Sequence, residues 1–149
     1  MTTAHQDVQI DPRGYRFGAA ITLALALLAL VLGATAAGLV TMAILTLMFL
    51  PGATIGPQAT VQAALFKRLV RPRIGPPAET ESFRPPRFAQ QMGLAMATAA
   101  LVLGALGLDW GFWVFAALVT VASFLNAVFG FCLGCEIYLL LKRASARAA

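Results

Sequence analysis

Four long apolar stretches limit the folds open to this chain. They run from about Phe17 to Leu32, from Ala36 to Leu50, from Phe88 to Leu108 and from Trp110 onward. A helix rises 1.5 Å per residue, so about 20 helical residues cross a hydrocarbon layer about 30 Å thick. Hydrophobic residues make up 60% of the 149 positions and charged residues 11%. The stretches lack the polar face of a helix in a soluble bundle, so we expect an all-α, polytopic membrane protein.

The predicted membrane helices cover about residues 16–33, 36–51, 86–108 and 111–141, within a single transmembrane domain over residues 1–149. Only the small-residue link GATAAG separates the first two apolar stretches, and a polar middle region precedes the third. The predicted order is therefore two helical hairpins joined by a loop.

The basic residues predict which side of the membrane each loop occupies. They lie before the first helix, in the loop of about residues 57–85 and after the fourth helix, whereas the two short turns opposite carry only Asp109 as a charge. By the positive-inside rule, we expect both termini and the loop in the cytoplasm, with the chain in a bacterial cytoplasmic (inner) membrane. The net charge of +5 then reports topology, and we expect no nucleic-acid partner.

Part of the loop has a helical period. Wound as a helix, PQATVQAALFKRLVRP places apolar residues on one arc and Lys67, Arg68 and Arg71 on another. This pattern predicts a short amphipathic helix at the inner leaflet. Its charges either hold the helix on anionic lipid or only enforce the topology.

The fourth apolar segment is too long for one span. As a straight helix from Phe112 to Leu141 it would measure about 45 Å. Either this helix tilts and projects from the membrane, or it breaks. Gly130 and Gly134 are the expected places for a break or a close helix crossing. About 20 residues inward from Trp110, the chain reaches the cytoplasmic interface.

The chain's two cysteines, Cys132 and Cys135, follow at that interface. In a helix they share one face, and two intervening residues is the spacing of dithiol redox centres. A reducing cytosol makes a permanent structural disulfide unexpected. Three interpretations stay open: a dithiol that cycles by exchange, two small hydrophobes packed beside glycines, and a metal-binding pair. Metal is the least favoured, because structural zinc takes four ligands and the one histidine, His5, lies in the amino-terminal tail.

Glu136 complicates the redox interpretation, because an adjacent carboxylate raises the pKa of a thiol. We expect a cation to compensate, and Arg16, Arg84 and Arg87 are predicted at the same membrane depth. An ion pair between Glu136 and one of them is therefore expected. Otherwise the acid reaches into water, or it relays the proton released during thiol exchange.

Two further polar residues flank the cysteine pair. Asn126 is the only strongly polar side chain predicted deep in the layer, and we expect it to bridge helices rather than to form a transport site. Tyr138 is predicted to anchor the helix at the interface, where its hydroxyl would also hold the Glu136 carboxylate.

Several segments together resemble a family of bacterial membrane proteins, the domain of unknown function numbered 4395. They are DPRGYRFGA at the first helix, GP after the second, LVRPRIGPP and PPRFAQQMG in the loop, and LNAVFGFCLGCEIYLLL at the end. The resemblance implies a four-helix inner-membrane protein with a carboxy-terminal cysteine pair, found beside or joined to thioredoxin-like or sulfur-carrier partners. It implies no particular activity. The most specific part of the motif comprises Asn126, Ala127, Gly130, Cys132, Gly134, Cys135 and Tyr138.

These observations favour a membrane-held dithiol that exchanges electrons or sulfur with a cytosolic thioredoxin-like or rhodanese-like protein docked on the basic loop. Whether such a chain counts as an enzyme is left open, and the sequence identifies no cofactor. The alternative is a non-enzymatic scaffold or small-solute carrier in which the cysteines only pack. A homo-oligomer is compatible with either interpretation.

Overall fold

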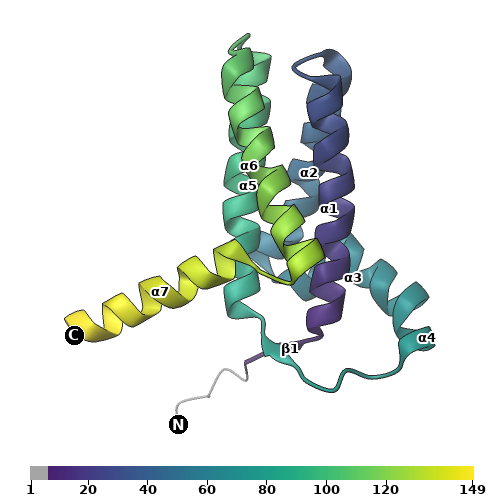
Figure 1. Cartoon of the computed structure of the whole chain (residues 1–149), viewed down its shortest axis with the longest axis vertical. Helices are drawn as coiled ribbons and strands as arrows, with labels where there is room; N and C mark the ends of the chain where they lie inside the picture. Colours follow the sequence, from purple (N-terminus) through teal and green to yellow (C-terminus); the bar gives the residue numbers. More distant parts are fainter. Residues whose placement is uncertain (1–6) are drawn as a thin grey trace.

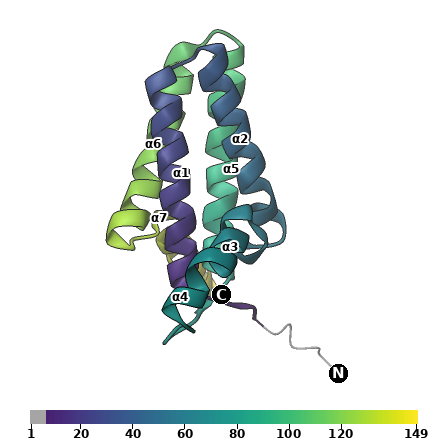
Figure 2. The same cartoon turned by 90° about the vertical axis from the view of Figure 1, so that its right-hand side faces the viewer.

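Four long helices stand side by side in the computed structural model, which describes residues 7–149 (Figure 1). They are α1 (Pro12–Leu32), α2 (Ala36–Thr54), α5 (Arg84–Ala105) and α6 (Asp109–Phe129). Each is long and apolar enough to cross a membrane. α1 and α2 form one hairpin and α5 and α6 the other, with α2 packed on α5 and α1 on α6 (Figure 2). The predicted all-helical class with two membrane hairpins is confirmed.

Small side chains let these helices approach closely. The buried centre of the bundle combines five alanines with a few large residues, of which Phe112, Met42 and Leu45 are the largest that are fully buried. Backbones pack closely across such alanines, which is how membrane helices commonly associate. Outward-facing residues are apolar as well, and Val31 is 83% exposed. The alanines are Ala26, Ala29, Ala97, Ala100 and Ala116.

Short elements connect the two hairpins at one end of the bundle. The chain passes through η1 (Pro57–Ala59), α3 (Val61–Leu65), the π-helical turn η2 (Phe66–Val70) and α4 (Arg71–Ile74). The predicted amphipathic helix is therefore a series of short helical segments. Its side chains divide in two directions, because Phe66 is 4% exposed against α1 whereas Val61, Leu65 and Leu69 are exposed.

A two-residue sheet ties together the entries to the two hairpins. β1 (Gln9–Ile10) precedes α1, and β2 (Glu81–Ser82) precedes α5. The two strands are antiparallel, with Gln9 opposite Ser82. An ion pair of 3.2 Å between Arg84 Nε and Asp7 Oδ1 lies beside them. Both hairpins therefore begin at the same end of the molecule.

Asp11 fixes the start of α1. Its Oδ1 accepts a hydrogen bond of 3.0 Å from the backbone N–H of Arg13, and Pro12 occupies the first helical position. The Arg13 side chain also binds the carboxylate, with its Nη2 2.9 Å from Oδ2. Hydrogen bonding by the Arg13 side chain lowers the pKa of the Asp11 carboxyl, against the opposing effect of partial burial.

The segment 111–141, predicted as one helix or as a helix broken at a glycine, is divided into two helices. α6 ends at Phe129, and α7 (Leu133–Ala148) leaves the bundle sideways (Figure 1). The single helix over 111–141 is therefore wrong, and the break falls at Gly130. The division leaves α6 with 21 residues, close to the length that one span requires.

Candidate functional site

Gly130 makes the turn that sets up the site. Its φ of 66° and ψ of 16° lie in the left-handed region, which side chains with a Cβ disfavour. The N–H groups of Gly130 and Phe131 donate to the carbonyls of Asn126 and Leu125, at 3.0 and 3.1 Å, and close the carboxy-terminal end of α6. The chain then starts α7 after only three residues.

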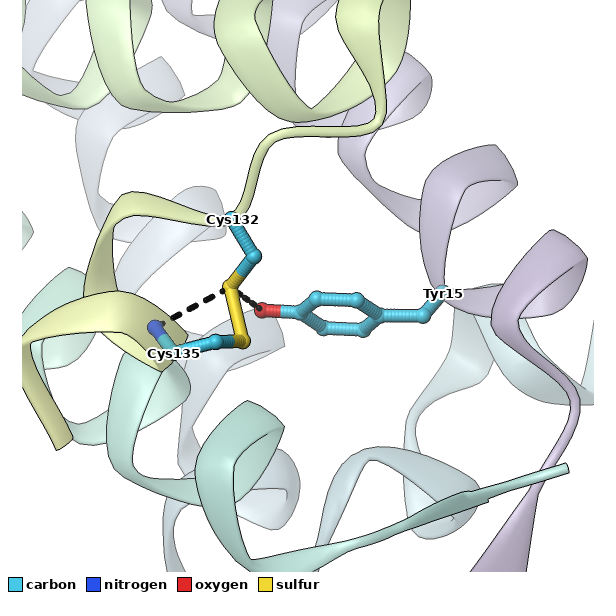
Figure 3. The surroundings of a disulfide bond; sticks show 3 residues. All are labelled: Tyr15, Cys132 and Cys135. Atoms are coloured by element: carbon cyan, nitrogen blue, oxygen red, sulfur yellow. Dashed lines mark hydrogen bonds between the residues drawn. A yellow bond between two sulfur atoms is a disulfide. The ribbon is translucent and has the colours of Figure 1, made fainter. Parts of the chain in front are cut away.

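Cys132 occupies the N-cap position of α7. Its Sγ accepts a hydrogen bond of 3.3 Å from the backbone N–H of Cys135 (Figure 3). The two sulfurs form a disulfide, with the Cα atoms 5.2 Å apart. The sequence predicts both cysteines inside one helix, whereas Cys132 precedes α7 in the structure. The N-terminus of a helix stabilises negative charge, so this position favours the thiolate of a reduced Cys132.

Tyr15 contacts the cysteine pair, which the sequence did not predict. It lies near the start of α1, and its hydroxyl points at the disulfide, 3.7 Å from Cys132 Sγ (Figure 3). A disulfide sulfur carries no proton, so the hydroxyl is the donor. The available signal was a tyrosine in DPRGYRFGA, at the same predicted membrane depth as the cysteines.

A cavity of about 80 Å³ adjoins the pair from the bundle side; we call it the sulfur cavity. Cys132 and Tyr15 line it, and Cys135 does not. Asn126, 6% exposed, also lines it. Within residues 7–149 the Asn126 amide forms no side-chain hydrogen bond, so the expected bridge between helices is not formed. Other polar side chains at the cavity are Thr22, Gln90 and Ser123.

The expected ion pair of Glu136 is also not formed within the part of the chain that the structure describes. Glu136 is exposed in the first turn of α7, where a carboxylate is favourable to the helix dipole. The three arginines have other partners. Arg16 Nη2 donates to the carbonyls of Ala127 and Val128, each at 3.3 Å, at the end of α6. Arg84 pairs with Asp7, and Arg87 Nε donates to the Ala53 carbonyl at 3.3 Å.

Two contacts hold the beginning of α7 on α5. Gly134 faces Ala89 so closely that an added Cβ would lie 2.6 Å from the Ala89 Cβ. One helical turn later, the rings of Tyr138 and Phe88 lie 5.7 Å apart. Tyr138 therefore packs as an aromatic anchor, with Lys142 Nζ 5.9 Å above its ring, and no hydrogen bond joins its hydroxyl to Glu136.

All eleven lysines and arginines lie at the end of the bundle that carries the disulfide. They occupy the beginnings of α1 and α5, the short helices between the hairpins, and α7. The opposite end has the α1–α2 and α5–α6 connections, with Asp109 as its charge. Among residues 7–149 no group of three or more metal-binding side chains occurs, and His5 lies outside the described residues.

Comparison with known proteins identifies the family. Residues 10–143 match the family described as Domain of unknown function (DUF4395). No curated protein and no solved structure matches the chain. Because the match covers most of the chain, the protein belongs to this family, as the resemblance of its loop and cysteine motifs predicted.

Proposed function

We propose that Cys132 and Cys135 form a redox pair that exchanges electrons or sulfur with a thioredoxin-like or rhodanese-like protein at the cytoplasmic face of a bacterial inner membrane. The observation that carries this proposal is the position of Cys132. Its sulfur caps a helix, accepts the Cys135 N–H at 3.3 Å and lies 3.7 Å from the Tyr15 hydroxyl. Both donors stabilise a thiolate, which is the nucleophile and the leaving group in disulfide exchange.

The covalent span of the bridge argues against a purely structural role. The disulfide joins residues three positions apart and links no second helix to α7. In the chain-entropy picture, stabilisation grows with the length of the closed loop, so a loop this short gains less than the roughly 3 kcal/mol of a 15-residue loop. This small stabilisation gives little reason for a disulfide at this position, whereas a role in disulfide exchange does.

The exchange is a balanced transfer between two dithiols. A thiolate of the partner attacks one sulfur of the Cys132–Cys135 disulfide, and the other sulfur leaves as a thiolate. The partner's second thiolate then attacks the mixed disulfide. The partner ends as a disulfide and the protein as a dithiol, with two electrons transferred. For a rhodanese-like partner, the Cys132 thiolate attacks the outer sulfur of a persulfide, and the partner's cysteine leaves.

The charge distribution supports a cytoplasmic site. The disulfide shares its end of the bundle with every lysine and arginine, and such residues are retained on the cytoplasmic side. Exposed cations at the same end of the bundle, including Lys67 and Arg68, offer an acidic partner a complementary surface. Glu136 is the carboxylate nearest in sequence to the pair, and its exposure suits exchange of the released proton with water.

Redox titration and trapping test the proposal. The protein in lipid nanodiscs is equilibrated with glutathione buffers, and the free thiols are counted by alkylation and mass. We expect a midpoint near the cytosolic poise of roughly −220 to −320 mV. In Cys135→Ser, the Cys132 thiolate should displace thionitrobenzoate from the activated single cysteine of a thioredoxin-like protein that lacks its resolving cysteine and so form a mixed disulfide, whereas Cys132→Ser should form much less.

A different outcome of the same titration and trapping would contradict the redox function. A pair that gives the same alkylation at every potential, with no covalent complex from either serine variant, would remove the redox function. The cysteines would then only pack, as in a scaffold or carrier.

A further inference from the structure

We propose that a second cavity binds a small thiol carrying both a carboxylate and an amine, and that this thiol reduces the Cys132–Cys135 disulfide. The inference rests on the proposed redox function and adds a substrate class to it. The cavity, which we call the polar cavity, has a volume of about 180 Å³. It lies at the basic end, between the start of α1, the elements η1 to η2 and the loop before β2.

Two glutamine side-chain oxygens there are buried and lack hydrogen-bond donors within residues 7–149. The Oε1 atoms of Gln58 and Gln62, which both line the polar cavity, accept no hydrogen bond within residues 7–149. Gln62 is only 5% exposed, so water does not freely compensate this oxygen. Buried acceptors are nearly always paired, because an unpaired one loses the free energy of its hydration. Neither oxygen faces the cavity space, so a ligand ammonium group would supply the missing donor to each after a rotation of the glutamine side chain toward the cavity.

The charges around the cavity select an anion as well. Lys67 and Arg71 line it, and Asp11 is its one acidic side chain. The Asp11 carboxylate is already bound to Arg13, with distances of 2.9 and 3.1 Å to the Arg13 side chain. Two cations therefore remain for a ligand carboxylate, which is a hard, charged acceptor suited to lysine and arginine. An amine and a carboxylate together describe an amino-acid-like molecule.

The polar cavity adjoins the sulfur cavity. Tyr15 and Gln90 line both. The Tyr15 hydroxyl lies 3.7 Å from Cys132 Sγ. A ligand in the polar cavity that extended past Tyr15 would therefore contact the disulfide. Because Cys132 lines the sulfur cavity and Cys135 does not, the approach leads to the sulfur of Cys132. A ligand anchored by its charged groups and carrying a thiol would react there.

The polar rim of the cavity favours a soluble ligand over a lipid headgroup. Gln9 and Thr80 line the cavity, and their side chains are joined by a 3.2 Å hydrogen bond beside the β1–β2 pair. The remaining walls come from the bundle interior and the short helices.

The chemistry balances with two molecules of thiol. The thiolate of the first attacks Cys132 Sγ, the disulfide breaks, and Cys135 leaves as a thiolate. The thiolate of the second attacks the ligand sulfur of the mixed disulfide, and Cys132 leaves, stabilised by the Cys135 N–H and the Tyr15 hydroxyl. The ligand is oxidised to its disulfide and the protein gains two electrons. The two protons released from the ligand thiols are taken up by Cys132 and Cys135.

Reduction kinetics provide the test. The oxidised protein in phosphatidylcholine nanodiscs is mixed with L-cysteine, cysteamine, 3-mercaptopropionate or 2-mercaptoethanol, and each rate is divided by that for a small reference disulfide. We expect saturation with L-cysteine and a normalised rate at least about tenfold above that of 2-mercaptoethanol, which equals about 1.4 kcal/mol. Cysteamine lacks the carboxylate and 3-mercaptopropionate lacks the amine, so each should lose most of the preference.

Matched variants locate the effect. Arg71→Ala and Lys67→Ala should lose the L-cysteine preference and keep the 2-mercaptoethanol rate, whereas Arg68→Ala, an exposed neighbour that does not line the cavity, should change neither. Gln62→Met removes the unpaired oxygen without leaving a large void. It should weaken saturation by L-cysteine but leave reduction by 3-mercaptopropionate unchanged.

Three results would overturn this inference. The first is a reduction rate that rises linearly with L-cysteine concentration, with the four thiols ranked as they are for the reference disulfide. This result would show that no binding site exists, and exchange with a protein partner would stay possible. Loss of the preference in nanodiscs containing phosphatidylethanolamine would assign the cavity to a lipid headgroup. Failure of every thiol, including dithiothreitol, to reduce the pair would remove the redox function itself.

Discussion

The hydroxyl of Tyr15 lies 3.7 Å from the sulfur of Cys132, although 117 positions separate the two residues. The contact joins the first membrane helix to the beginning of the last helix. It makes the environment of the cysteine pair depend on the first hairpin as well as on α7. A donor supplied by another helix can therefore tune the reactivity of a thiol whose own neighbour in sequence is an acid.

Replacing Tyr15 by phenylalanine should raise the pKa of the reduced Cys132 thiol. The ring is kept, and the hydroxyl that donates to sulfur and also bonds the Gln90 side chain is lost. Hydrogen bonds to charged groups contribute about 1.5–3 kcal/mol, so the loss of this donor disfavours the thiolate. The rate of alkylation by iodoacetamide against pH measures the pKa in the Cys135→Ser background. Tyr138→Phe is the matched control and should leave the profile unchanged.

Replacing Asn126 by leucine should leave the stability of the protein unchanged or raise it. The amide lines the sulfur cavity and forms no side-chain hydrogen bond within residues 7–149, so its loss breaks no bridge. Thermal unfolding in nanodiscs is the measurement, with Ala122→Leu at the same cavity as a control for volume. A loss of about 0.5 to 2 kcal/mol in Asn126→Leu alone would instead support the interhelical bridge expected from the sequence.

Replacing Gly134 by alanine should displace α7 from α5. The added Cβ would lie 2.6 Å from the Ala89 Cβ, and overpacking of this kind typically costs about 1–3 kcal/mol. Cysteines introduced at Phe88 and Tyr138, with the native pair changed to serine, report the displacement by crosslinking. We expect crosslinking to fall in Gly134→Ala and to persist in Ser145→Ala, on the exposed half of α7. Equal yields in both would contradict the close packing.

The free energy of unfolding should fall at acid pH as the Asp11 carboxylate becomes protonated. Its carboxyl has a folded pKa below the ordinary value of 3.8 because of the Arg13 side chain. Its stabilisation is therefore complete above about pH 4 and is lost as the pH falls through the lowered folded pKa. Asp11→Ala should cost about 1 kcal/mol at pH 7, through loss of the cap. Thermal unfolding between pH 7 and 3 should also show a flatter acid limb in this variant.

The two ends of the bundle should lie on opposite sides of the membrane. With both native cysteines replaced by serine, a cysteine at Ser145 in α7 is expected to react with an impermeant maleimide only after cell lysis. A cysteine at Asp109, the first residue of α6, should react in spheroplasts with the membrane intact. The reverse labelling would place the disulfide outside the cytoplasm.

The length of the apolar stretches predicted the membrane helices well, because each apolar segment is buried by lipid as well as by neighbouring helices. Their ends were harder to predict. α2 continues to Thr54 through Pro51, which was the expected limit, because the N–H of Ile55 still donates to the Pro51 carbonyl. Likewise, the length of the segment after Trp110 predicted that it exceeds one membrane span. Length did not determine which of the two glycines, Gly130 or Gly134, would break the helix.

The candidate site was predicted only in part. The cysteine spacing drew attention to Cys132 and Cys135, but the N-cap geometry depends on the left-handed turn at Gly130. The predicted ion pair of Glu136 does not form, because a shared membrane depth does not determine the direction in which a long side chain points. Arg16 instead binds carbonyls at the end of α6, which have no partner within the helix and lie at the negative end of its dipole. Tyr15 was missed because pairings between distant helices leave no periodic signal.

The pairing of β1 with β2 has a mechanical consequence. The backbone N–H of Phe83, just before α5, donates to the Val8 carbonyl at 2.9 Å, next to the Gln9–Ser82 register. A force applied to the amino-terminal tail would therefore load the second hairpin through this clamp before it unwinds the first turn of α1. Anything tethered at that end of the chain would pull on both halves of the bundle at once.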